Sequence, residues 1–282
     1  MTVFLHYVPV FVSACAAAAL GSALGRMVGY RLECVMPRRL GRKSHPGEVP
    51  WLGGLGLVLG VVPALMTADV AGRGDILYTA GEMARQRAGI AAGLLVLFFW
   101  GVVVDRRRWN AVWVLPGQLA AILITAGAGV RVQALEPLGL SSLSPGWSYV
   151  VTVLWLFIVM NFMRFLDGID GLPEGLAAVI VALHLAQTPA EGWHFMPLLG
   201  AALVGALVGA LPQAVYPARL YPGQNGSSMP GFMVGVISIV ARQKSVLTVT
   251  FVLPAAIVFL TLALIGLRVI ERQLLLHQRR GR

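Results

Sequence analysis

The sequence predicts an all-α integral membrane protein, a bundle of about nine transmembrane helices with eight to eleven as the alternatives. Of its 282 residues, 57% are hydrophobic and 12% are charged, and the mean hydropathy is +0.78. A soluble domain has about 25% charged residues. The apolar segments show no alternation of polar and apolar residues, which argues against a transmembrane barrel. Most of the chain therefore faces lipid or other apolar helices.

A membrane-crossing helix needs about 20 mostly apolar residues. The candidate spans, some of them shorter than this, are 3–25, 51–68, 89–104, 110–127, 147–163, 172–187, 195–212, 229–241 and 246–267. Short spans suit a bundle in which polar loops dip toward the membrane surface. No internal repeat or linker is evident, so we take residues 1–282 as one transmembrane domain that ends in a short basic cytoplasmic tail, 268–282.

The basic residues set the predicted orientation. Alternate loops hold 16 of the 22 Lys and Arg residues, and the richer side is expected to be cytoplasmic. This places the N-terminus outside and the C-terminus inside. The net charge of +10 then indicates loops that face anionic lipid rather than nucleic acid. The two cysteines suggest neither a disulfide framework nor a metal cluster.

One loop on the basic side concentrates chemistry-bearing residues. It runs from Asn161 to Leu172 and reads N-F-M-R-F-L-D-G-I-D-G-L. Asp167 and Asp170 lie on one face if the segment is helical. The glycines between and after them allow a ligand to approach the backbone. Such a pair can hold a divalent cation, accept a proton or bind a polar substrate, although a solvated loop end is the simpler interpretation of either acid alone.

Three further loops lie on the same predicted side. His45–Gly56 is either a tight turn or a backbone nest for phosphate. Asp105–Arg108 is either a membrane anchor or an arginine cluster for a diphosphate. Tyr216–Ser228 is either an ordinary polar loop or an anion site at a helix N-terminus, in which Arg219 adds charge and Tyr221 stacks on a base.

In this order, the four loops resemble the polyprenyl-phosphate N-acetylhexosamine-1-phosphate transferases, the glycosyl transferase family 4. The family's P-x-x-G-G string is matched by Pro50 to Gly54, and its Asp-Asp-Arg string is matched in part by Val104 to Arg106. The N-x-x-N-x-x-D-G-x-D-G string is matched by Asn161 to Gly171 except at Arg164, and P-A-R-[IL]-[FY]-x-G is matched by Pro217 to Gly223. The resemblance runs from about residue 37 to 240.

The resemblance implies transfer of a sugar 1-phosphate from a UDP-sugar to polyprenyl (undecaprenyl) phosphate, with release of UMP. This chemistry belongs to cell-wall or lipopolysaccharide synthesis at the bacterial inner membrane, with the active-site loops on the cytoplasmic side. The implied partners are the lipid phosphate, the UDP-sugar and the bilayer, without nucleic acid, and a homodimer stays open. The implied cofactor is Mg²⁺, which neutralises charge on the diphosphate.

By the same resemblance, Asp105, Asp167 and Asp170 are the expected catalytic residues, with Asp105 near the lipid phosphate. Gln224, with Asp105, occupies the expected metal position. The residues implied in nucleotide or substrate binding are Asn161, Gly168, Ile169, Arg164, Arg219, Tyr221, Gly223, Lys43, His45, Pro50, Gly53 and Gly54.

Three residues depart from the family pattern. Val104 replaces the first Asp of the pair, Arg164 replaces the second Asn, and Gln224 replaces a magnesium-binding Asp, so metal dependence is expected to be weakened or lost. One alternative is therefore a degenerate member that binds lipid, nucleotide or a partner without turnover. A transporter is a second alternative, but the acids lie at span ends, and His184 is expected to snorkel toward the outer surface.

Overall fold

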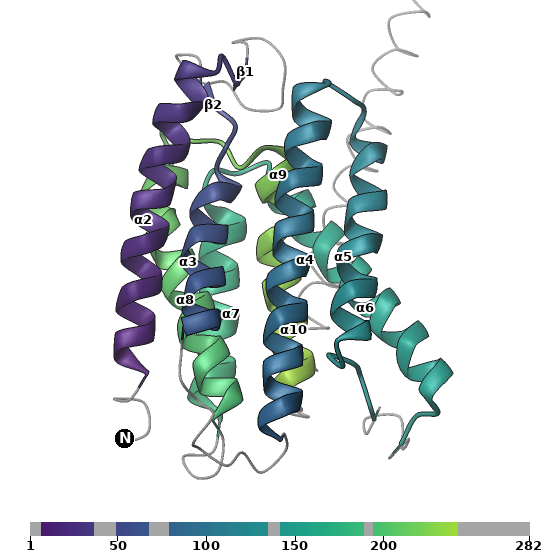
Figure 1. Cartoon of the computed structure of the whole chain (residues 1–282). Coiled ribbons are helices and arrows are strands. Elements are labelled where there is room, and N and C mark those ends of the chain that lie inside the picture. The colour runs from purple at the N-terminus through teal and green to yellow at the C-terminus, as the bar shows by residue number, and fades with distance from the viewer. Residues whose placement is uncertain (1–6, 37–48, 68–78, 135–141, 189–193, 242–282) are drawn as a thin grey trace, which may run out of the picture. The chain divides into compact units, whose positions relative to one another are not determined.

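The computed structural model describes residues 7–36, 49–67, 79–134, 142–188 and 194–241. Contacts divide the chain into a unit of Met1–Gln243 and a unit of Lys244–Arg282, and all described residues belong to the first. This part is almost entirely helical, as the composition predicts (Figure 1). The predicted span 246–267 and the predicted tail 268–282 lie outside the described residues.

The elements in the described ranges are helices and one pair of short strands near the start. They are α2 (Val8–Arg31), β1 (Val35–Met36), β2 (Val49–Pro50), α3 (Gly54–Thr67), α4 (Ala80–Arg106), η1 (Ala111–Val114), α5 (Leu115–Gly127), α6 (Pro145–Leu166), α7 (Leu172–Ala186), α8 (Phe195–Ala214), α9 (Gly223–Ser227) and α10 (Met229–Ala241). Each predicted span up to 229–241 contains a helix.

The strands β1 and β2 pair antiparallel, with Val35 opposite Pro50 and Met36 opposite Val49. The sequence did not predict them, because two residues are too few to show the alternation by which a strand is found. The pair joins the end of α2 to the start of α3 and brings the Pro50–Gly54 stretch to the end of the bundle where α9 lies (Figure 1).

Small residues let α2 pack closely against α3 and α8. A Cβ added at Gly209 of α8 would overlap the carbonyl of Cys15 in α2, and a Cβ at Gly60 of α3 would lie 2.8 Å from Cβ of Ala18. Helices that associate in lipid depend on such close backbone approach, because no hydrophobic effect drives them together there.

The helix α4 begins nine residues earlier than the predicted span 89–104. Thr79 and Glu82 form a capping box, in which Thr79 Oγ1 accepts from the backbone N–H of Glu82 at 3.3 Å and Glu82 Oε2 accepts from that of Thr79 at 2.9 Å. This cap satisfies donors that the first turn would otherwise leave without partners.

Arg85 and Arg87 consequently lie within α4 and not in the outer loop predicted for 69–88. Arg85 Nε donates to the carbonyl of Ala128 at the end of α5, and Arg87 Nη1 donates to that of Leu65 near the end of α3. Cations are favoured at helix C-termini, where carbonyls lack intrahelical partners. The hydropathy pattern did not predict that charged residues within a helix would donate hydrogen bonds to the ends of neighbouring helices.

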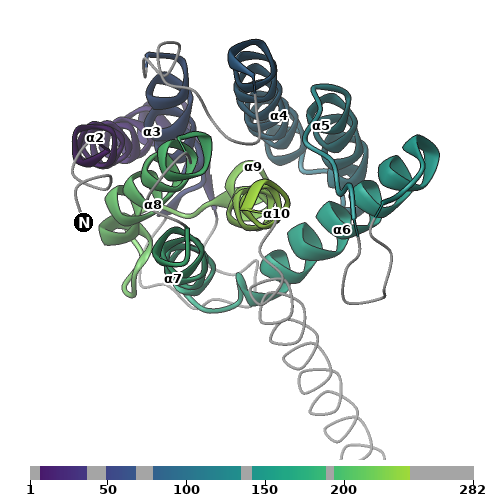
Figure 2. The same cartoon turned by 90° about the horizontal axis from the view of Figure 1, so that it is seen from below.

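The short helix α10 is the centre of the unit (Figure 2). All of its residues, Met229–Ala241, are buried, and it contacts α4, α6, α7, α8 and α9. A helix that is apolar on every side is expected in such a position. The buried hydroxyl of Ser238 accepts from Trp155 Nε1 of α6 at 2.9 Å, so its polar group is satisfied.

In the part of the chain that the structure describes, four helices, α2, α4, α6 and α8, are long and apolar enough to cross a membrane, and α3, α5, α7 and α10 are shorter apolar helices. This composition fits an integral membrane protein. The count of nine spans and the orientation stay predictions. His184 does not snorkel: its side chain is 1% exposed, and Nδ1 lies 2.8 Å from the carbonyl oxygen of Ile180.

Candidate active site

Residues from four distant stretches of the sequence meet at one end of the bundle. The last turn of α4 contributes Asp105, the end of α6 contributes Arg164, and α9 contributes Gln224. Gln224 is hydrogen-bonded to both Asp105 and Arg164. The fourth stretch, Pro50–Gly54, joins through the loop that precedes α9. The sequence order of the motifs predicted this meeting, and the hydrogen bonds establish it.

Gln224 links α4 to α6. Its backbone N–H donates to Asp105 Oδ2 at 2.8 Å, while its side-chain Oε1 accepts from Arg164 Nη2 at 2.6 Å. The left-handed backbone of Gly223, with φ of 62°, turns the chain into α9 and presents the Gln224 amide to Asp105.

Arg164 is half-buried and lies among acidic groups. Its guanidinium interacts electrostatically with the carboxylates of Asp167 and Asp105. A guanidinium carries its charge at all physiological pH values and presents up to five N–H donors in one plane. The site therefore contains a fixed positive charge of the kind that binds phosphate oxygens in pairs.

Tyr221 connects the acidic turn to the loop before α9. Its hydroxyl donates to Asp167 Oδ2 at 3.2 Å, and its ring packs against the buried cluster of Cys34, Trp51 and Leu52. Burial raises the pKa of the Tyr221 phenol above its ordinary value, and the adjacent Asp167 carboxylate raises it further. The phenol is therefore a neutral hydrogen-bond donor at physiological pH.

The Pro50–Gly54 stretch holds this loop by backbone hydrogen bonds. The Tyr221 N–H donates to the Pro50 carbonyl at 2.8 Å, and the Gly53 N–H donates to the Tyr221 carbonyl at 3.0 Å. A Cβ at Gly53 would lie 2.8 Å from the Tyr221 oxygen, and one at Gly226 would lie 2.9 Å from the Gly54 nitrogen. Gly53 and Gly226 are thus required for close packing, whatever this loop contacts in a substrate.

The segment that carries Asp167 and Asp170 is a turn and not a helix, so the expectation of two carboxylates on one helical face is wrong. Gly171 adopts a left-handed conformation with φ of 73°, and the next helix begins at Leu172. Gly171 is the N-cap of α7, and its αL conformation, which glycine adopts without a steric penalty, turns the chain into that helix. Asp167 and Asp170 both still act electrostatically on the Tyr221 phenol.

Asn161 is part of a buried amide network that sequence reasoning missed. Its Nδ2 donates to Gln118 Oε1 at 3.0 Å, and Gln118 Nε2 donates to Ser228 Oγ at 2.8 Å. Gln118 is fully buried in α5. A polar residue inside an otherwise apolar span was the available signal, because it requires partners there. Asn161 thus joins α6 to α5 and to the start of α10.

The remaining predicted residues are more peripheral. The side chains of Arg219 and Ile169 are exposed, as is Gly168 in the turn after α6. Lys43 and His45 lie outside the described residues. Val104, at the position of the expected first acid, is fully buried, and its carbonyl accepts from the Trp109 N–H at 3.0 Å.

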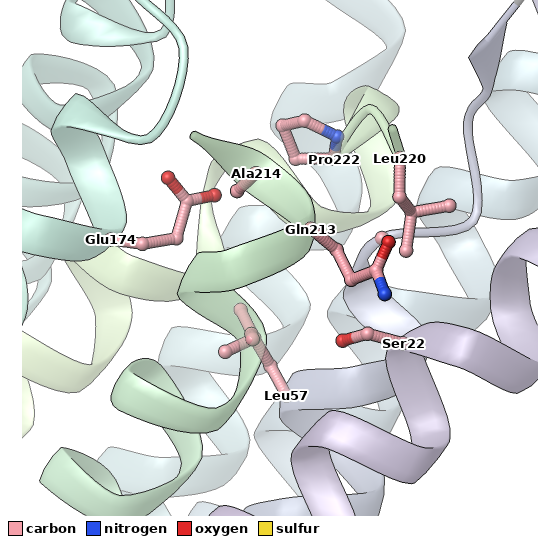
Figure 3. A pocket seen from close by; sticks show the side chains of 9 residues that line it. Ser22, Leu57, Glu174, Gln213, Ala214, Leu220 and Pro222 are labelled. Carbon is pink, nitrogen blue, oxygen red and sulfur yellow. The ribbon is translucent and has the colours of Figure 1, made fainter. Parts of the chain in front are cut away.

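A small cavity lies beneath the loop before α9 (Figure 3). Its volume is about 20 Å³, and the lining includes Ser22, Glu174, Gln213 and Pro222. The lining is mostly apolar, but it includes polar side chains, and a cavity of this size has room for one water molecule. The Gln213 backbone carbonyl accepts from the N–H groups of Arg219 and Leu220, which ties the loop to the end of α8. The loop is therefore anchored from below as well as by Pro50.

A comparison with protein families decides the family. The model of glycosyl transferase family 4 matches residues 88–242, more than half of the chain. The chain belongs to glycosyl transferase family 4. Three of the four site stretches lie in the matched region, and Pro50–Gly54 precedes it.

Individual members of glycosyl transferase family 4 are more distant. The chain is 25% identical over 218 residues to a "probable undecaprenyl-phosphate N-acetylglucosaminyl 1-phosphate transferase" of Bacillus subtilis, covering 77% of this chain and 58% of that protein. It is 28% identical over 275 residues to a decaprenyl-phosphate N-acetylglucosaminephosphotransferase of Mycobacterium tuberculosis, covering 88% and 66%. It is 26% identical to a phospho-N-acetylmuramoyl-pentapeptide-transferase of Halalkalibacterium halodurans, over 75% of this chain and 67% of that protein. The chain thus spans about two thirds or less of the length of the first two relatives.

The described residues do not fit a divalent cation held by Gln224. Its Oε1 already accepts a hydrogen bond from the Arg164 guanidinium at 2.6 Å. A divalent ion about 4 Å from that guanidinium would be repelled by roughly 8 kcal/mol at an effective dielectric of about 20. Within the described ranges, no group of three or more His, Cys, Asp and Glu side chains converges as metal ligands. The expectation of Gln224 and Asp105 as magnesium ligands therefore has no geometric support here.

Proposed function

We propose that this chain transfers an N-acetylhexosamine 1-phosphate from a UDP-sugar to polyprenyl phosphate. The observation that carries the proposal is the hydrogen-bonded meeting of Asp105, Arg164 and Gln224 from three helices, beside the Tyr221–Asp167 pair. The names of the relatives in glycosyl transferase family 4, which describe this transfer to undecaprenyl or decaprenyl phosphate, support it.

The reaction exchanges one phosphoanhydride bond for another. An oxygen of the lipid phosphate attacks the β-phosphorus of the UDP-sugar, and the bond from that phosphorus to the bridging oxygen breaks. UMP leaves with the electron pair, and the sugar phosphate stays on the lipid as a diphosphate. The protein's task in such a transfer is positioning and charge stabilisation.

The site residues divide this task between them. Asp105, at the end of α4, is proposed to accept the remaining proton of the lipid phosphate or to orient it. Tyr221 is proposed to stack on uracil, held in place by Asp167. Asp170, which also acts electrostatically on the Tyr221 phenol, is proposed to complete the nucleotide side of the site. The site is proposed to face the cytoplasm at the bacterial inner membrane.

The test is release of UMP by the purified full chain in detergent. The donors are UDP-N-acetylglucosamine, UDP-N-acetylgalactosamine and UDP-N-acetylmuramoyl-pentapeptide, with undecaprenyl phosphate as acceptor. We expect UMP from at least one donor, and a loss of about 100-fold or more in Asp105→Asn, as is usual when a catalytic acid–base group is removed. If every donor fails while the Bacillus subtilis relative releases UMP in parallel, the proposal is refuted.

A non-catalytic descendant is the second candidate, favoured by the burial of Val104 and the Arg164–Gln224 contact. Restoring the family pattern with Val104→Asp, Arg164→Asn and Gln224→Asp separates the two candidates. If the wild type is inactive and the triple variant is active, the chain is a degenerate enzyme. If the wild type is active and the triple variant loses that activity, the site is rewired. No described observation favours a transporter, because Asp105, Asp167 and Asp170 lie at helix ends.

A further inference from the structure

Arg164 and Gln224 are hydrogen-bonded to each other, and Gln224 is also hydrogen-bonded to Asp105. The guanidinium donates to the Gln224 amide oxygen at 2.6 Å, and the Gln224 backbone N–H donates to Asp105 at 2.8 Å. Gln224 is therefore held on one side by α4 and on the other by α6. An amide oxygen accepts a hydrogen bond from a guanidinium without neutralising it, so Arg164 is fixed in place with its charge intact.

The location of that charge matters for a diphosphate. Arg164 lies within electrostatic range of Asp105, Asp167 and Tyr221, which come from the proposed lipid-phosphate and nucleotide sides of the site. A guanidinium between these groups can donate a pair of N–H bonds to phosphate oxygens while one remaining N–H stays on Gln224. Gln224 contributes no charge and is half-buried, as expected for a residue that orients another.

We propose that Arg164 binds the diphosphate of the substrate, that Gln224 is the positioning residue that orients it, and that substrate binding does not require a divalent cation on Gln224. The inference rests on the proposed function for the identity of the diphosphate. It differs from the family resemblance, which places a metal ligand at position 224.

Gln224→Glu discriminates between the two roles of Gln224. Glutamate has nearly the same shape and accepts the same hydrogen bond from Arg164, but its carboxylate neutralises the guanidinium. If Gln224 orients a charged Arg164, the variant should bind UDP more weakly than the wild type, by about 10-fold or more. If Gln224 is a metal ligand, the added carboxylate should strengthen Mg²⁺-dependent UDP binding instead.

The measurement is isothermal titration of the purified full chain with UDP and with uridine, each in EDTA and in Mg²⁺. We expect the wild type to bind UDP in EDTA, and Arg164→Gln to bind UDP about 10- to 100-fold more weakly with unchanged uridine affinity. Arg131→Gln is the matched control. Arg131 follows the C-terminal end of α5, and its guanidinium lies over the Tyr149 ring and not among the site residues. Its UDP affinity should equal that of the wild type.

The outcomes separate this inference from the proposed function. UDP binding that depends on Arg164 without any UMP release refutes the transfer and leaves the inference standing. UMP release with UDP affinity unchanged in Arg164→Gln overturns the inference alone. Wild-type UDP binding that is lost in EDTA and strengthened by Gln224→Glu in Mg²⁺ also overturns it.

Discussion

Tyr221 shows how one side chain connects two of the site stretches. Its ring packs on the cluster of Cys34, Trp51 and Leu52, its N–H donates to Pro50, and its hydroxyl donates to Asp167. The sequence predicted the residue as a stacking platform. It did not predict the bond to Asp167, because that bond depends on the turn at Gly171 and on the packing of α6 against α7.

Substitution of Tyr221 separates the ring from the hydroxyl. Tyr221→Phe keeps the aromatic face, so we expect the KM for the UDP-sugar to rise less than about 3-fold. Tyr221→Ala removes the face, and a stacking energy of about 1–3 kcal/mol predicts a rise of about 5- to 150-fold. Steady-state UMP release measures both. Equal KM values for the two variants would contradict a stacking role.

The Tyr221 phenol makes the stability of the folded protein depend on pH in the alkaline range. Because its pKa is raised in the folded protein, the stabilisation is complete below about pH 10, the ordinary tyrosine value, and is lost as the pH rises toward the folded value. Tyr221→Phe should therefore lose less thermal stability than the wild type between pH 9 and pH 11. Tyr216→Phe, at an exposed tyrosine of the same loop, is the control. If the melting temperature of Tyr221→Phe fell with pH as steeply as that of the wild type, the raised pKa of Tyr221 would be excluded.

Single residues also show where sequence reasoning fails. Asn161 was predicted from its motif, but its partner Gln118, in another helix, was not, because partners across helices depend on the packing. Val104 was noted as a departure, and its complete burial shows that the position points into the core in this chain. An aspartate there would require a partner or a shift of α4.

At the level of elements, hydropathy predicted each of the apolar described helices, because apolar runs of this length have few other uses. It did not predict the short helix α9, whose residues are small or polar. It misplaced the start of α4, since Arg85 and Arg87 lower the local hydropathy while they satisfy carbonyls of neighbouring helices. It could not predict β1 and β2, which are held by two-residue pairing and position Pro50 beside Tyr221.

Glycine contacts between α2 and α8 supply a test at this scale. A Cβ at Gly209 would overlap the Cys15 carbonyl, so Gly209→Ala forces the helices apart, at about 1–3 kcal/mol of stability. We expect a lower melting temperature in detergent. Gly127→Ala, at a helical glycine with no neighbour within 4 Å, should be neutral or slightly stabilising. Equal melting temperatures for the two variants would refute the close approach of α2 and α8.

For the described unit as a whole, the central feature is α10, buried by α4, α6, α7, α8 and α9. These helices carry or flank the residues that meet at the site, so their packing around α10 sets the distances between Asp105, Arg164 and Gln224. The sequence predicted which stretches meet from the order of their motifs. It could not predict that Arg164 would hold Gln224, because that contact depends on the relative placement of α6 and α9.

Hydrogen–deuterium exchange of the full chain with and without UDP tests most directly whether these stretches form one nucleotide site. We expect peptides that cover 50–54, 104–109, 161–172 and 217–228 to gain protection together at saturating UDP. Peptides that cover Thr79–Arg87, at the opposite end of α4, should not change. Protection confined to one of the four stretches, or protection at Thr79–Arg87 instead, would contradict a single shared site.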